Sequence, residues 1–148
     1  MVARKIIWFV AWAIGLCLQS TTAFAQDIPR AFLCRGLTGV WLGAPAWKPE
    51  ADAMTGQEVL LSYTGKAQQS EVKWYRDGKV YFESPGIGVP MNGGFAIVVL
   101  GDEYLETYVF NSGTTELLMS ATRSGSSALP NSIKSQRGVC KAAGAMVR

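Results

Sequence analysis

The feature that most constrains the fold is a series of short runs of β-branched and aromatic residues, each ended by a turn signal. No helical period extends beyond a turn or two, and the chain contains no internal repeat or linker. Short runs bounded by Gly, Asp, Asn or Ser are typical of β-strands. We therefore predict eight strands, at Val40 to Gly43, Gln57 to Thr64, Glu71 to Arg76, Lys79 to Ser84, Phe95 to Leu100, Glu103 to Asn111, Thr114 to Arg123 and Ser132 to Cys140. This pattern favours an all-β fold, a small antiparallel up-and-down barrel, with an immunoglobulin-like β-sandwich as the alternative.

Three turn sequences connect neighbouring predicted strands: Asp77-Gly78, Gly101-Asp102 and Ser112-Gly113. Asp-Gly between alternating apolar residues is the strongest short-range hairpin signal. Two-residue turns at these positions set the cross-strand register. The expected partners include Trp74 with Tyr81, Tyr75 with Val80, Phe95 with Tyr108, Glu106 with Met119, and Tyr108 with Leu117.

This register also sorts the side chains of three strands by face. We assign the larger and more aromatic face to the interior; it holds Phe95, Ile97, Val99, Tyr104, Glu106, Tyr108, Phe110, Leu117, Met119, Ala121 and Arg123. Glu106 would then point among apolar groups, where a carboxylate needs a partner, a proton or a ligand. Arg123 is the candidate partner. The alternative is that this face looks partly outward, with Glu106 in water.

The N-terminus has the order of a secretory signal peptide: Arg4 and Lys5, an apolar run from Ile6 to Leu18, then Ala23-Phe24-Ala25. Cleavage after Ala25 leaves residues 26–148 as one domain. An uncleaved anchor is the alternative, but the run of 13 residues is shorter than the roughly 20 that span a bilayer. A lipid anchor at Cys17 is disfavoured because Leu16 stands where a small residue is normal. We expect a periplasmic or extracellular protein without stable membrane insertion.

Composition excludes several function classes. Removing residues 1–25 lowers Lys plus Arg from 14 to 12 and leaves Asp plus Glu at 11, so the net charge is 12 − 11 = +1. Without a basic run, no nucleic-acid partner is expected. The chain has no histidine, which excludes Ser-His and Cys-His catalysis and His-ligated metals. We therefore expect a protein that is not an enzyme and binds no metal or cofactor. In an oxidising compartment Cys34 and Cys140 should form a disulfide, the alternative being two free thiols.

Two long connections, Ala44 to Gly56 and Pro85 to Gly94, are predicted as loops. Long loops in a small β-domain are often functional. Trp47 in "APAWKPE" and Met91 in "GVPMNG" are the candidate contact residues for a protein partner. Trp74 is expected to pack against the sheet.

Gly39-Val40-Trp41, at the predicted entry to the first strand, resembles the G-x-W motif of the lipocalin and calycin barrels. The resemblance implies an eight-stranded barrel whose chain ends are tied by a disulfide and whose mouth holds a small apolar ligand. It also implies that Trp41 packs across the closed end. Arg137 would cover it in a cation–π contact.

The preferred function is therefore a secreted or periplasmic binding protein for a small apolar or amphipathic ligand. The candidate ligand-binding residues are Glu106, Tyr104, Tyr108, Met119 and Arg123. The alternative is a protein–protein interaction module, such as an inhibitor or immunity factor for a secreted hydrolase.

Overall fold

The computed structural model describes residues 30–66, 68–125 and 131–144 of the chain. The predicted signal peptide therefore lies outside the described residues. The described residues form nine strands: β1 (Arg30–Gly43), β2 (Glu50–Ala53), β3 (Gln57–Tyr63), β4 (Ser70–Arg76), β5 (Lys79–Met91), β6 (Gly94–Leu100), β7 (Tyr104–Asn111), β8 (Glu116–Arg123) and β9 (Ser132–Ala142).

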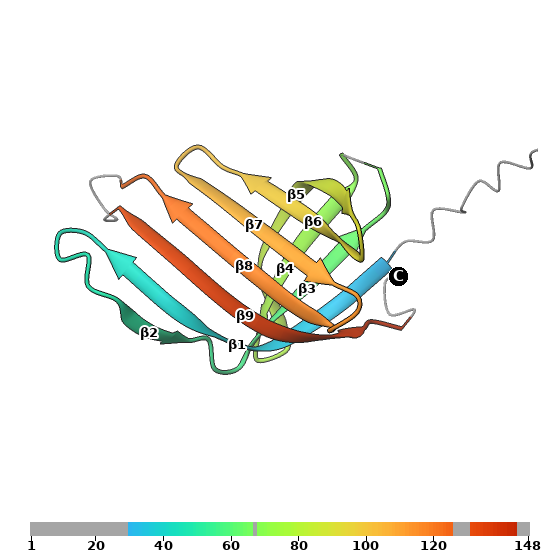
Figure 1. Ribbon diagram of the computed structural model, residues 1–148, viewed down its shortest axis with the longest axis horizontal. Helices are drawn as coiled ribbons and strands as arrows, with labels where there is room; N and C mark the ends of the chain where they lie inside the picture. Colours follow the sequence, from blue (N-terminus) through green and yellow to red (C-terminus); the bar gives the residue numbers. More distant parts are fainter. Residues whose placement is uncertain (1–29, 67, 126–130, 145–148) are drawn as a thin grey trace, which may run out of the picture.

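All neighbouring strands are antiparallel, and the sheet closes on itself because β1 also pairs with β9 (Figure 1). The other edge of β1 has two partners. Its first half pairs with β3 and its second half with β2, so β2 is a short extra strand in line with β3. The fold is thus an eight-stranded antiparallel closed barrel with one extra strand. Closure confirms the predicted barrel and excludes the sandwich.

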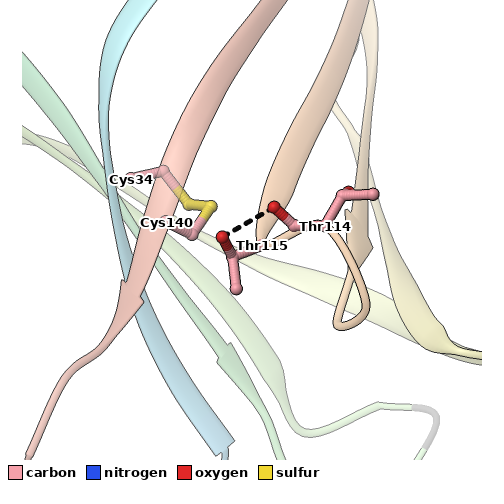
Figure 2. Close-up of a disulfide and its surroundings, with 4 residues drawn as sticks. All are labelled: Cys34, Thr114, Thr115 and Cys140. Carbon is pink, nitrogen blue, oxygen red and sulfur yellow. Dashed lines mark hydrogen bonds between the residues drawn. A yellow bond between two sulfur atoms is a disulfide. The ribbon is translucent and has the colours of Figure 1, made fainter.

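Cys34 and Cys140 form the predicted disulfide. The two residues lie opposite each other in the β1–β9 pairing that closes the barrel. The turn between β7 and β8, which carries Thr114 and Thr115, lies beside them (Figure 2). The backbone N–H of Cys140 donates to the carbonyl of Thr115 at 2.8 Å. The disulfide therefore joins the two ends of the described chain at the pairing that is most distant in sequence.

Two strands extend beyond their predicted limits by more than two residues. The first begins at Arg30 instead of Val40, because a bulge between Arg35 and Thr38, with Gly36 at φ 63°, continues the pairing with β9. β5 continues through Met91, so the predicted loop from Pro85 to Gly94 is wrong.

The Gly and Pro residues between Pro85 and Gly94 predicted a loop, but the glycines in this segment of β5 have a steric role. Gly86 and Gly88 face the barrel interior, where there is no room for a side chain. A Cβ on Gly86 would lie 2.4 Å from Ile97 Cγ2, and one on Gly88 would lie 2.2 Å from Ser70 Oγ. These glycines allow close packing across the strand and do not mark a turn.

The hairpin at Asp77-Gly78 is confirmed, with Arg76 opposite Lys79 and Tyr75 opposite Val80. Both turn residues have positive φ, as a type I′ turn requires. A bulge then shifts the register, so Trp74 lies opposite Phe82 and not Tyr81.

The other two hairpins have longer turns than predicted, and each moves the register by two residues. Tyr108 lies opposite Met119 instead of Leu117, and opposite Ile97 instead of Phe95. A shift of two residues keeps every side chain on the same face. The predicted interior assignment is therefore confirmed for all but one residue. Arg123 is exposed, Tyr104 is partly buried, and the others are buried: Phe95, Ile97, Val99, Glu106, Tyr108, Phe110, Leu117, Met119 and Ala121.

Aromatic side chains fill one end of the barrel, the end where β1 begins and β9 finishes. The Phe32 and Phe110 ring centroids are 4.0 Å apart, and the Tyr63 ring stacks on Phe95 at 4.6 Å. This cluster closes that end. The opposite end carries the Asp77-Gly78 turn and is hollow.

Candidate ligand-binding site

A cavity of about 390 Å³ occupies the hollow end of the barrel. Its size falls within the roughly 300–1,000 Å³ that is usual for small-molecule sites. Six strands and one connecting residue contribute to its wall, which is mostly apolar and aromatic with three charged side chains. The lining residues are Trp41, Met54, Trp74, Tyr81, Phe82, Glu106, Met119, Ala121, Arg123, Ser132 and Lys134.

Glu106 lies inside the barrel, because β7 places alternate residues inward. Its side chain is only 6% exposed, which excludes the alternative that it points into water. Tyr108 Oη lies 2.5 Å from Glu106 Oε2, and Trp74 Nε1 lies 2.9 Å from the same Tyr108 oxygen. An indole N–H can only donate, so Tyr108 accepts from Trp74 and donates its own proton to Glu106. The three side chains form one oriented hydrogen-bond chain.

Burial and the neighbouring Glu106 carboxylate both raise the pKa of Tyr108 above its ordinary value. Burial has the larger effect, because a phenolate would lose its hydration inside the barrel. Tyr108 therefore keeps its proton at neutral pH and remains a donor to Glu106.

The expected ion pair between Glu106 and Arg123 is wrong. Arg123 lies opposite Tyr104 in the β7–β8 pairing, whereas Glu106 lies opposite Ala121. The guanidinium carbon of Arg123 sits 6.0 Å from the Tyr104 ring centroid. Among the described residues, no cation lies within ion-pairing distance of Glu106.

A polar cluster at the cavity edge was missed from the sequence. Lys134 Nζ forms an ion pair with Asp52 Oδ2 at 2.7 Å, and Gln136 Nε2 donates to the same oxygen at 2.9 Å. Lys134 and Gln136 come from β9, and Asp52 comes from β2, which lies within a segment predicted as a loop. The alternation of side chains along β9 could have predicted that Lys134 points inward. No local sequence feature indicated that Asp52 would be its partner.

Trp41 is not at the closed end. It lies near the end of β1 and lines the cavity, so the predicted plug is wrong in position. The predicted cation–π contact is also wrong: Arg137 pairs with Thr38 in register and points outward from the barrel. Trp41 instead lies over Gly43, where a Cβ would fall 2.2 Å from the indole carbons. The aromatic cluster around Phe95 closes the other end.

Replacing Gly43 with alanine should therefore displace the Trp41 ring. We expect a loss of about 1–3 kcal/mol in the free energy of unfolding, the usual cost of overpacking. Urea denaturation followed by tryptophan fluorescence measures it. Gly144→Ala is the control, because a Cβ there meets nothing within 4 Å. Equal stabilities of the two variants would contradict the placement of the ring.

The structure brings together three of the five predicted ligand-binding residues, since Glu106, Met119 and Arg123 all line the cavity. Tyr108 lies behind Glu106, and Tyr104 packs against Phe82 with ring centroids 6.4 Å apart. The sequence missed the roles of Met54, Tyr81, Phe82 and Lys134 and placed Trp74 only in sheet packing.

The two predicted protein-contact residues do not share a surface. Trp47 follows β1 at the hollow end and is 45% exposed, with φ 50°. Met91 is the last residue of β5, at the end that the aromatic cluster closes. A larger hollow of about 980 Å³ lies outside the barrel at that same end, between Ala31, Gln69 and Glu83. Among the described residues that line this outer hollow, no charged side chain is buried as Glu106 is.

No family model, no curated protein and no solved structure matches this chain. The architecture itself, an eight-stranded antiparallel closed barrel, is consistent with a calycin-like fold. No helix able to span a bilayer occurs in residues 30–66, 68–125 and 131–144.

Proposed function

We propose that the chain is a non-enzymatic binding protein that holds a small amphipathic molecule in the hollow end of the barrel. The observation that carries this proposal is the position of Glu106, a buried carboxylate at a cavity whose walls include Trp41, Trp74 and Phe82. An apolar cavity with a few well-placed polar groups is the general form of a small-molecule site. Among the described residues, Glu106 is the one carboxylate in the cavity lining, and Asp52 at the cavity edge is engaged by Lys134 and Gln136.

We further propose that the protein is a distant lipocalin-like member of the calycin barrels and acts in the periplasm or outside the cell. The closed eight-stranded barrel and the Gly39-Val40-Trp41 motif support the first part. The Cys34–Cys140 disulfide and the character of residues 1–25 support the second, because disulfides persist in oxidising compartments.

An inhibitor or immunity factor is the second candidate function. The exposed indole of Trp47 favours it, since an exposed loop tryptophan is a common contact residue. Met91 lies at the other end of the barrel, so one small interface would not include both residues. Ligand binding has the broader support, and we rank it first.

Filling the cavity tests the first proposal. Ala121 lines the cavity from β8, so Ala121→Leu should occupy part of its volume. The neutral fluorescent probe N-phenyl-1-naphthylamine should bind the wild-type protein, and the variant should bind it at least about tenfold more weakly. Ser120→Leu is the matched control, because Ser120 is the neighbouring residue on the outer face of the same strand. If both variants retain wild-type affinity, the probe binds elsewhere and the proposed site is wrong.

A further inference from the structure

At Glu106 the cavity wall offers a hydrogen-bond acceptor, and the buried partners Tyr108 and Trp74 have no donor left for a ligand. The proton of Tyr108 is directed to Glu106 Oε2, and the indole proton of Trp74 is directed to Tyr108. Glu106 Oε1 accepts no hydrogen bond from the described residues, although the cavity borders this side chain. A ligand group that reaches Glu106 therefore meets a carboxylate oxygen, Oε1, that has no hydrogen bond from the described residues.

The two cationic side chains that line the cavity, Lys134 and Arg123, both contact groups other than Glu106. Lys134 is neutralised by Asp52 at 2.7 Å, and the exposed Arg123 side chain lies over the Tyr104 ring. Among the described residues, Glu106 has no cation within ion-pairing distance, although Arg123 lines the same cavity. A buried carboxylate without a counter-ion is costly, and a bound cation would offset that cost.

The cavity walls suit a cation as well. Trp41, Trp74, Tyr81 and Phe82 present aromatic rings to the cavity, and aromatic faces attract ammonium groups. Two rings at this end of the barrel already hold protein cations: Arg76 lies 4.9 Å from the Tyr81 centroid, and Arg123 lies over Tyr104.

We infer that the ligand enters with a protonated primary or secondary amine on an apolar body, and that the amine binds Glu106 Oε1. This inference rests on the proposed function and names its ligand class. An alcohol could donate one hydrogen bond but would leave the buried charge uncompensated. A carboxylate would face Glu106 with like charge.

Three probes with the same six-carbon body separate these cases: hexylamine, hexan-1-ol and hexanoate, titrated by isothermal calorimetry at neutral pH. We expect hexylamine to bind at least about tenfold more tightly than hexan-1-ol, and hexanoate to bind most weakly. Glu106→Gln keeps the shape of the side chain and an acceptor for Tyr108. It should remove the preference for the amine while changing hexan-1-ol affinity less than about threefold.

Glu103→Gln is the matched control. It removes the same charge near the same end of the barrel, but Glu103 is exposed and does not line the cavity. It should leave the amine preference unchanged. Equal binding of hexylamine and hexan-1-ol, or an amine preference that Glu106→Gln retains, would overturn the inference and leave the cavity as a ligand site. Absence of binding by all three probes and by N-phenyl-1-naphthylamine would overturn the proposed function as well.

Discussion

Replacing both Cys34 and Cys140 with alanine should lower the free energy of unfolding by about 4–5 kcal/mol. The disulfide closes a loop between residues 106 positions apart, and the chain-entropy model predicts a stabilisation of this size for so long a loop. The effect should be large because the crosslink joins β1 to β9, the pairing that closes the barrel. Urea denaturation followed by circular dichroism measures the change.

The reduced wild-type protein separates the crosslink from the packing of the two side chains. The experiment uses a protein that begins at Gln26. Its reduction should lower the urea midpoint almost as far as the double substitution does. The oxidised protein should have a mass two hydrogens below the reduced one and no reactive thiol after denaturation. A midpoint that does not change on reduction would contradict the stabilising role of the disulfide.

Tyr108→Phe should cost about 3 kcal/mol, the second largest effect that we expect. The substitution deletes one oxygen but removes two buried hydrogen bonds, from Trp74 and to Glu106. A hydrogen bond to a charged group contributes about 1.5–3 kcal/mol, and a buried donor left without a partner costs a further 1–3 kcal/mol. Chemical denaturation measures the loss, and the emission of Trp74 should shift because its indole N–H loses its partner.

Tyr63→Phe is the matched control for this experiment. Tyr63 stacks on Phe95, and its hydroxyl makes no hydrogen bond to the described residues. This variant should change stability by less than about 0.5 kcal/mol. If the two variants are equally stable, the chain from Trp74 through Tyr108 to Glu106 does not contribute to folding as described.

Much of the interior could be predicted because β-strand alternation is a local property. The turns at Gly101-Asp102 and Ser112-Gly113 are longer than two residues, and the predicted partners were therefore displaced by two. A displacement by an even number leaves each residue on its face, so Glu106 and Met119 were placed correctly inside. The disulfide was predictable for a different reason: residues 26–148 contain only two cysteines, so only one pairing is possible.

The candidate site was harder to predict, because its residues meet across the barrel. The partner of Glu106 is Tyr108, which is held by Trp74 from β4, whereas the sequence favoured Arg123. The bulge at Trp74 brings Phe82 opposite it, and no turn signal marks this bulge. Contacts of this kind depend on how the closed sheet curves and where bulges shift its register.

From the sequence alone we predicted the all-β class and the pairing of Cys34 with Cys140, and we preferred an inward face to an outward one for the residues that include Glu106 and Met119. These features follow from cysteine count and from a period of two residues. Only the tertiary structure decided that Trp41 lies at the hollow end, that the Gly- and Pro-rich segment around Gly88 is a strand, and that Asp52 neutralises Lys134. The physical reason is closure: joining β1 to β9 determines which inward side chains meet and where the interior stays empty.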